Sequence, residues 1–214
     1  MKSSYDYRAQ ARQTLNGRWN DAIPAILIYF LLVAIYSSIS SIGAVLQPDK
    51  AYLYNSLTTV IAVFLIMPMG FALQNTFLRM ARGSEKSPLT DMFNIFRAGY
   101  ERLLPAALLM SIIVGGLAIV TLGILGFVFA YAYRLTPYLL EDYPQLSTTE
   151  ALKTSRQMMK GHKWDLFILD ISFIGWVILT IFSCGIGVLW LEPYIGIAQA
   201  HFYEDIKAET LTEE

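Results

Sequence analysis

The sequence is poor in cysteine and in charged residues. Cys184 is the one cysteine among 214 residues, which excludes an intrachain disulfide and any metal centre built from several cysteine thiolates. Charged residues make up 15% of the chain, whereas a soluble globular domain has about 25%. No basic tract has the density that nucleic-acid binding requires. These absences argue against a soluble protein and against a nucleic-acid partner.

Motifs that carry enzyme chemistry are missing as well. The chain has no glycine-rich phosphate-binding loop, no paired-histidine metal motif and no nucleophile elbow. Its two histidines, His162 and His201, are far apart and lack the spacing of a zinc site. We therefore predict no catalytic, cofactor-binding or metal-binding residues, and we expect that the protein is not an enzyme.

Apolar segments are what the sequence has in abundance. Hydrophobic residues make up 55% of the chain, and the mean hydropathy is +0.46. Two runs are long enough to cross a bilayer core, which takes roughly 20 residues, and two others are too long for one span. Each long run contains a turn signal, at residues 121–123 and 183–185. The sequence therefore predicts an all-α membrane protein with six spans, at residues 22–45, 57–80, 103–121, 124–140, 166–182 and 186–203.

The distribution of basic residues supports this count. Lys and Arg concentrate on the cytoplasmic side of helical membrane proteins. With six spans, 14 of the 16 basic residues fall on the side that carries both termini, while Lys50 falls on the other side and Arg134 within a span. We therefore expect both termini to be cytoplasmic.

The polar segments on the cytoplasmic side have amphipathic helical patterns. Ser147 and Glu150 form a capping-box motif before a helix with basic residues on one face. Ser87-Pro88 and the stripe around Ala11 mark two similar helices. We expect each helix to lie at the membrane interface, with its basic face toward anionic headgroups; the alternative is that the three are solvated loop helices packed on the span ends. The candidate lipid contacts are Arg12, Arg18, Lys153, Arg156, Lys160, Lys163, Trp19 and Trp164.

These segments resemble one another closely enough to suggest an internal repeat. Residues 11–19 and 155–164 each combine the end of an amphipathic helix, a glycine and a basic, tryptophan-containing entry to a span; residues 96–102 are a fainter copy. The glycines Gly17, Gly99 and Gly161 suit helix ends that need a positive φ. We predict one integral membrane domain of three units, near residues 5–80, 87–142 and 147–205, each an interfacial helix followed by a helical hairpin whose returning span contains a proline. Residues 206–214 form a short acidic tail.

The last unit carries a resemblance to a known family. Residues 155–164, 173–176, 185–187, 193–194 and 202–204 resemble the bacterial integral-membrane family 975 of the domains of unknown function, and residues 11–19 and 91–96 fit it as well. The layout is also distantly similar to the membrane domain attached to some glycerophosphodiester phosphodiesterases. The resemblance implies a multi-pass bacterial membrane protein. It implies no activity and no site.

Three ionisable residues fall inside predicted spans, where charge is costly and often functional. Arg134 and Asp170 lie at similar depths from the cytoplasmic end, so we predict an ion pair between them. The alternative is that Arg134 reaches to the interface and Asp170 hydrogen-bonds locally. Glu192 lies beside Pro193, whose missing N–H leaves a polar kink. Arg134, Asp170 and Glu192 form the candidate intramembrane polar site.

These features favour a non-enzymatic module of the bacterial cytoplasmic membrane. Its expected partners are the anionic inner leaflet and another membrane protein. A transporter or permeation component for a small solute is the first alternative, because of the prolines in the returning spans and the three charges. A membrane domain assisting lipid-directed enzymology is the second, from analogy of layout alone.

Overall fold

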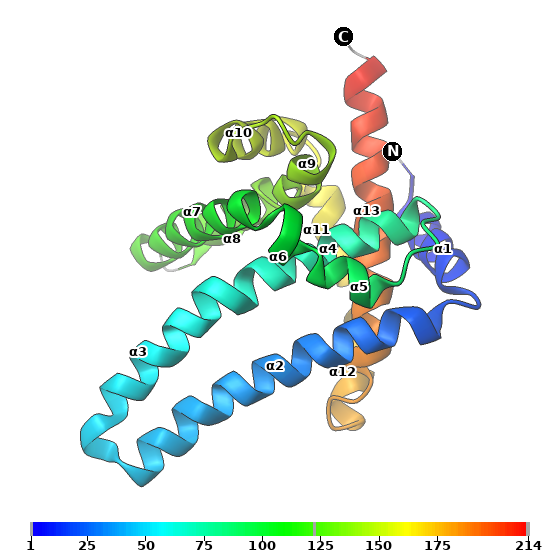
Figure 1. Cartoon of the computed structure of the whole chain (residues 1–214). Helices are drawn as coiled ribbons and strands as arrows, with labels where there is room; N and C mark the ends of the chain where they lie inside the picture. The colour runs from blue at the N-terminus through cyan, green and yellow to red at the C-terminus, as the bar shows by residue number, and fades with distance from the viewer. Residues whose placement is uncertain (1, 122, 213–214) are drawn as a thin grey trace.

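The protein is all-helical over the residues that the structure describes. The computed structural model describes residues 2–121 and 123–212, and no strand occurs in these ranges. The all-α prediction is confirmed. The elements are α1 (Ser4–Leu15), α2 (Trp19–Leu46), the 3-10 helix η1 (Pro48–Lys50), α3 (Ala51–Ile61), the π-helix η2 (Ala62–Ile66), α4 (Met67–Ala81), α5 (Pro88–Phe93), α6 (Ile95–Ala98), α7 (Tyr100–Val120), α8 (Ile124–Ala132), α9 (Thr136–Asp142), α10 (Thr148–Met158), α11 (Lys163–Ile171), α12 (Ile174–Phe182) and α13 (Val188–Thr212) (Figure 1).

Four helical stretches are long and apolar enough to cross a membrane: Trp19–Leu46, Pro48–Ala81, Tyr100–Val120 and Lys163–Phe182. They coincide with four of the six predicted spans. The second stretch joins η1, α3, η2 and α4, and its π-helical turn ends two residues before Pro68. Proline cannot donate the usual helical hydrogen bond, and a π-turn is one way in which a helix accommodates that loss.

The two other predicted spans have a different structure. Residues 124–140 do not form one helix, because the chain leaves α8 after Ala132 and re-enters helix as α9 at Thr136. Pro137 explains this break, since its ring would clash with the carbonyl of Tyr133 in a continuous helix. Residues 186–203 lie mostly in α13, which continues to Thr212 and includes Glu192, Gln199 and His201 among its apolar residues.

Helix α13 is at the centre of the molecule. It packs against α1, α2, α4, α10, α11 and α12. Gly196 lets the ring of Phe77 lie directly against the α13 backbone, where a Cβ would clash. Tyr7 of α1 donates a 3.0 Å hydrogen bond to Asp205 of α13, and Leu15 is fully buried. Complete burial of a leucine contributes about 1.5–3 kcal/mol. The buried side chains of α1, which are Tyr7, Ala11 and Leu15, therefore attach this helix to α13.

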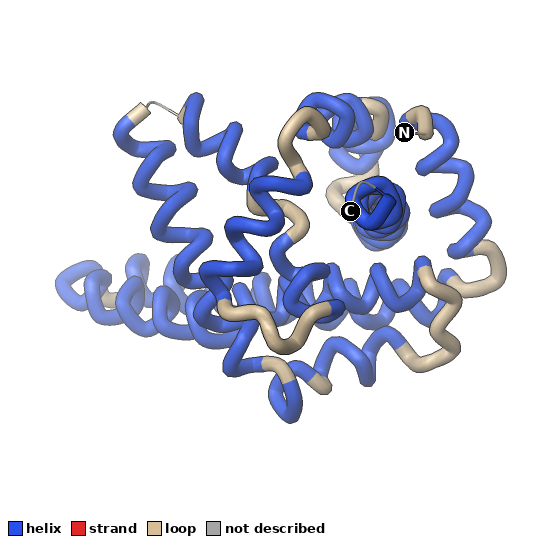
Figure 2. Tube along the Cα trace, turned by 90° about the horizontal axis from the view of Figure 1, so that it is seen from above, coloured by secondary structure: helices blue, strands red, loops and turns tan. Residues whose placement is uncertain are grey.

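The apolar helices extend outward from α13 and expose their side chains. Figures 1 and 2 show that the pair α2–α3 and the pair α7–α8 each extend away from the long axis of α13, and that the two pairs extend in different directions. The ends of α7 and α12 are almost fully exposed: Ile119, Val120 and Phe182 are each more than 80% exposed. Apolar surface of this extent is unfavourable in water and is typical of a surface that contacts lipid.

The short polar helices begin and end with the residues that the sequence indicates, with one exception. Ser147 and Glu150 form the expected capping box, and Ser3 with Asp6 forms a second at the start of α1. Gly17 and Gly161 have the expected positive φ, at 76° and 95°. Gly99 does not: its φ of 169° is extended backbone, so the prediction of a positive φ there was wrong. The chain between α6 and α7 makes its turn without a left-handed residue.

Candidate functional site

A glutamine on α13 joins the two charges for which the sequence predicts an ion pair. Arg134 Nη2 donates to Gln199 Oε1 over 2.8 Å, and Gln199 Nε2 donates to Asp170 Oδ1 over 2.8 Å. Although both charged residues are described, they form no direct ion pair within 4.0 Å. The predicted direct pair was therefore wrong. An amide carries a donor and an acceptor side by side, so Gln199 satisfies both charges at once.

Breaks in two helices bring these charges to α13. Arg134 lies in the turn between α8 and α9 that Pro137 imposes, and Asp170 lies at the end of α11, before the bend at Ser172. That bend frees the Ser172 carbonyl, which accepts a 3.0 Å hydrogen bond from Arg8 of α1. Gln199 itself is 4% exposed on the central helix.

Two tyrosines and the third predicted charge complete a polar cluster, which we define as Arg134, Gln199, Asp170, Tyr131, Tyr138 and Glu192. Tyr131 donates its hydroxyl to Asp170 Oδ2 over 2.9 Å, so both oxygens of that carboxylate are occupied. Glu192 interacts electrostatically with Arg134. The fully buried hydroxyl of Tyr138 has no hydrogen-bond partner in the described chain, and it lies within electrostatic reach of Arg134, Asp170 and Glu192.

The contacts of this cluster hold helices together. Hydrogen bonds that involve a charged partner are among the stronger ones, at roughly 1.5–3 kcal/mol each. Those of Arg134 and Asp170 connect α8, the α8–α9 turn, α11 and α13. Within the described ranges, no three His, Cys, Asp or Glu side chains gather as a metal site would require.

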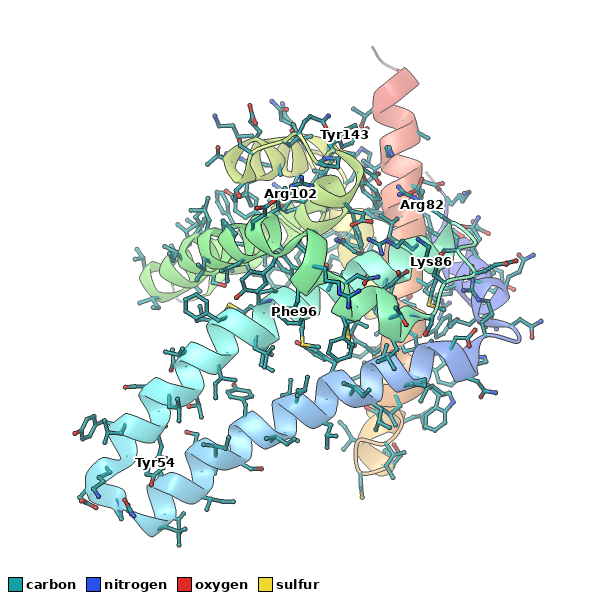
Figure 3. All side chains as sticks on the ribbon, viewed as in Figure 1. Tyr54, Arg82, Lys86, Phe96, Arg102 and Tyr143 are labelled. Atoms are coloured by element: carbon teal, nitrogen blue, oxygen red, sulfur yellow. The ribbon has the colours of Figure 1, made fainter. Side chains whose placement is uncertain are left out.

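A second network lies where α4 and α9 end. Arg82 donates from Nη1 and Nη2 to the two oxygens of Asp142, over 2.6 and 2.7 Å, and from Nε to Glu204 of α13 over 2.7 Å. Figure 3 shows Arg82 beside α13. Tyr203 and Lys207 of α13 also donate to Asp142, over 2.7 and 2.6 Å. Arg82, Asp142, Tyr203, Glu204 and Lys207 therefore join α4, α9 and α13, and we call them the ionic network.

The ionic network controls the charge of Asp142. Burial opposes ionisation of this carboxyl, but hydrogen bonds from Arg82, Lys207 and Tyr203 outweigh burial and lower its pKa to about 2. The pKa of Arg82 is raised, chiefly by its hydrogen bonds to Asp142. Both groups are therefore charged at neutral pH. Nearby, Arg79 pairs with Asp91 over 3.2 Å and with Glu141.

Comparison with protein families matches residues 103–210 to the family described as "Protein of unknown function (DUF975)". This match spans just over half of the 214 residues. The chain belongs to the DUF975 family. No curated protein and no solved structure matches it.

The DUF975 match contains the whole polar cluster and four of the five residues of the ionic network. Arg82 lies outside it, on the preceding helix, and connects that helix to the matched segment. Sequence reasoning missed the ionic network. The signal was present, because Glu141-Asp142 and Glu204-Asp205 occupy similar places in two units. The basic residues of the network, Arg82 and Lys207, however, lie outside the three predicted units.

The predicted lipid contacts of this DUF975 protein divide into two groups. Arg18 donates to the Ser84 carbonyl over 2.5 Å, and so fixes the loop before α5. Lys153 and Arg156 are exposed on α10, Lys160 is exposed in the turn after it, and Arg156 lies 5.3 Å from the centre of the Phe129 ring. Within the described chain, no ion pair involves Arg12, Lys153, Arg156, Lys160 or Lys163. Trp164 is 65% exposed, and Trp19 is half-buried.

Two cavities lie away from the polar cluster. One, of about 470 Å³, is polar and is lined by Arg79, Asp91 and Glu141 together with Lys86 and Arg97. The other is an apolar groove of about 500 Å³ between the start of α2 and the pair α12–α13, with Arg12 at its edge. Neither is lined by Arg134, Asp170 or Glu192.

Proposed function

We propose that this protein is a non-enzymatic, six-span module of the bacterial cytoplasmic membrane whose interfacial helices bind anionic lipid headgroups. Its partners would be the inner leaflet and, through the same surface, another membrane protein. Both termini would face the cytoplasm. The three units, near residues 5–80, 87–142 and 147–205, would each contribute one interfacial helix and one membrane hairpin.

The observation that carries the proposal is the division of the cations into two groups. Arg79, Arg82 and Arg134 each bind an internal partner. By contrast, Arg12, Lys153, Arg156, Lys160 and Lys163 form no ion pair in the part of the chain that is described. A cation that forms no internal ion pair is available to an anionic headgroup, and each contributes about 1 kcal/mol near such a surface.

The helix α10 fits this role in detail. Its buried face, Ala151, Leu152, Ser155 and Met158, packs onto the protein. Ser155 donates to the Ala132 carbonyl over 2.9 Å, which attaches α10 to the end of α8. Lys153 and Arg156 on α10, and Lys160 directly after it, are exposed. An interfacial helix needs this combination of an attached apolar face and a basic outer face.

The six-span topology extends what the four apolar stretches support. It requires that α8 with α9, and α13, also cross the bilayer despite their polar residues. The polar cluster supports this arrangement, because polar groups inside a membrane domain pair with one another. The hydrogen-bonded state of Arg134 and Asp170 favours a structural role for these charges over a transport pathway.

Lipid-dependent stability tests the proposal. The protein is placed in nanodiscs of phosphatidylglycerol or of phosphatidylcholine, and thermal unfolding is measured in each. We expect a higher Tm in phosphatidylglycerol, a difference that the triple variant Lys153→Gln, Arg156→Gln, Lys160→Gln reduces by at least half. The control Lys50→Gln, at an exposed position predicted on the opposite side, should retain it. Equal Tm values for the unmodified protein in the two lipids would refute the proposal.

A further inference from the structure

The apolar groove between the start of α2 and the pair α12–α13 has an unusual lining. Three of the chain's four tryptophans line it: Trp19, Trp176 and Trp190. Leu191 and Tyr194 of α13 also line it, with Leu179, Thr180, Ser183 and Gly187 from α12 and the turn that follows. Trp176 and Trp190 are about half exposed, at 51% and 47%, so their rings remain accessible to a ligand. At about 500 Å³, the groove has the size of sites that bind small molecules, roughly 300–1,000 Å³.

One charged side chain, Arg12, lies among the residues that line this groove. It is exposed, and within the described chain it has neither an ion pair nor a hydrogen bond through its side chain. The neighbouring arginines differ, since Arg8 donates to the Ser172 carbonyl and Arg18 to the Ser84 carbonyl. The guanidinium of Arg12 therefore remains available to an anion at the edge of an apolar groove.

We propose that this groove binds one anionic phospholipid of the inner leaflet, with its phosphate on Arg12 and one acyl chain along Trp176 and Trp190. An amphiphile with a single anionic head and an apolar tail matches a groove with one cation and aromatic walls. Arginine binds phosphate oxygens through two parallel N–H groups, which suits this position. The hydroxyl of Tyr194 lies within electrostatic reach of Arg12 and Arg8, at the headgroup end.

This site differs from general attraction to the inner leaflet. The cations of α10 face outward and would meet many exchanging headgroups, whereas the groove would hold one lipid molecule. The inference rests on the proposed lipid-binding function, because α1 must lie on the side of the anionic leaflet. The groove site and the proposed function can nevertheless be refuted separately, because Arg12 and the α10 cations are different residues.

Quenching of tryptophan fluorescence by a brominated acyl chain tests the site. In a Trp164→Phe background, every remaining tryptophan lines the groove. Tail-brominated phosphatidylglycerol, added to the protein in detergent micelles, should quench with saturation at one lipid per protein. Tail-brominated phosphatidylcholine should bind at least fivefold more weakly. Arg12→Gln should abolish the headgroup preference, Arg12→Lys should restore most of it, and the control Lys153→Gln should leave it unchanged.

Two results would overturn the site. One is quenching that rises in proportion to the bromolipid fraction, with no headgroup preference. The other is an Arg12→Gln variant that behaves as the parent does while retaining its helix content by circular dichroism. Photo-crosslinking with an acyl-chain diazirine phosphatidylglycerol gives a second measurement: crosslinks should map to residues 176–191, and crosslinks spread evenly over the apolar helices would contradict the proposal. If phosphatidylglycerol raises the Tm but the groove shows no preference, the groove fails and the proposed function stands.

Discussion

Arg82, at the end of α4, binds both carboxylate oxygens of Asp142, the last residue of α9, over 2.6 and 2.7 Å. The two residues are 60 positions apart in the sequence. The Asp142 side chain is 7% exposed and that of Arg82 is 34% exposed, so the carboxylate of this bidentate ion pair is largely shielded from water. A buried charge without its partner is unfavourable. Removing one partner therefore destabilises the fold more than removing an exposed pair does.

The first prediction concerns the pH dependence of stability. The pKa of Asp142 is lowered to about 2, whereas an unfolded aspartate has a pKa of about 3.9. A group whose pKa is lower in the folded state stabilises the fold above the unfolded pKa, and this contribution is lost as the pH falls through the folded pKa. Asp142 should therefore contribute about 2 kcal/mol at neutral pH, lost between about pH 4 and pH 2.

Asp142→Asn tests this contribution. Thermal unfolding in detergent should show a lower Tm at pH 7 for the variant and a smaller further decrease between pH 4 and pH 2 than in the parent. Asp165→Asn is the control, because Asp165 pairs with His162 over 3.4 Å and its side chain is 48% exposed. Exposed pairs contribute about 0–1 kcal/mol, so its effect should be small. Identical acid profiles for the parent and Asp142→Asn would contradict the assignment.

The second prediction concerns Gln199. Gln199→Leu removes the amide between Arg134 and Asp170 and leaves both charges short of a partner, so we expect a loss of about 2–3 kcal/mol in the free energy of unfolding. The double variant Arg134→Met, Asp170→Leu removes both charges. It should cost less than the two single substitutions added together, since neither Arg134 nor Asp170 is left without the other.

Equilibrium unfolding in detergent measures these free energies. Gln13→Leu serves as the control, because Gln13 is exposed on α1 and should tolerate the change. If the loss of unfolding free energy in the double variant equals the sum of the losses in the two single variants, Gln199 does not couple Arg134 to Asp170.

The third prediction compares two glycines in corresponding places of the proposed units. Gly161 has a φ of 95°, where a side chain is strained, and Gly99 has a φ of 169°. No atom lies within 4 Å of a Cβ built at either position, so space is not the difference. Gly161→Ala should destabilise by about 1 kcal/mol and Gly99→Ala by clearly less, as measured by thermal unfolding. Equal losses would show that φ does not govern these turns.

The sequence predicted those features that depend on local composition. Run length and turn residues placed the apolar helices, and the capping box at Ser147 followed from its motif. The break between α8 and α9 was also within reach, because Pro137 lies four residues after Tyr133. It was missed because the apolar run continues across the break, and length alone does not reveal an interrupted helix.

The contacts that sequence reasoning missed depend on tertiary packing. Arg134 and Asp170 were recognised as costly charges, but Gln199 was not, since a lone glutamine in an apolar run carries no distinguishing pattern. Arg82 appeared to be one more cytoplasmic cation. Its role depends on three helix ends meeting, which neither the spacing nor the composition of any one segment specifies.

Cys184 offers the most direct test of the six-span topology. It is exposed in the turn between α12 and α13, and is the chain's one cysteine. Six spans place this turn outside the cell. If only the four apolar stretches cross, starting from a cytoplasmic N-terminus, Lys163–Phe182 is the fourth crossing and Cys184 lies inside.

The measurement is labelling of Cys184 in intact cells with a membrane-impermeant maleimide. Cys184→Gly, tolerated because φ there is 51°, provides the unlabelled background, and adding Lys160→Cys provides a cytoplasmic control. The six-span account predicts that Cys184 is labelled in intact cells, while Cys at position 160 is labelled only after permeabilisation. Labelling of Cys184 only after permeabilisation, with position 160 reactive in intact cells, would contradict it.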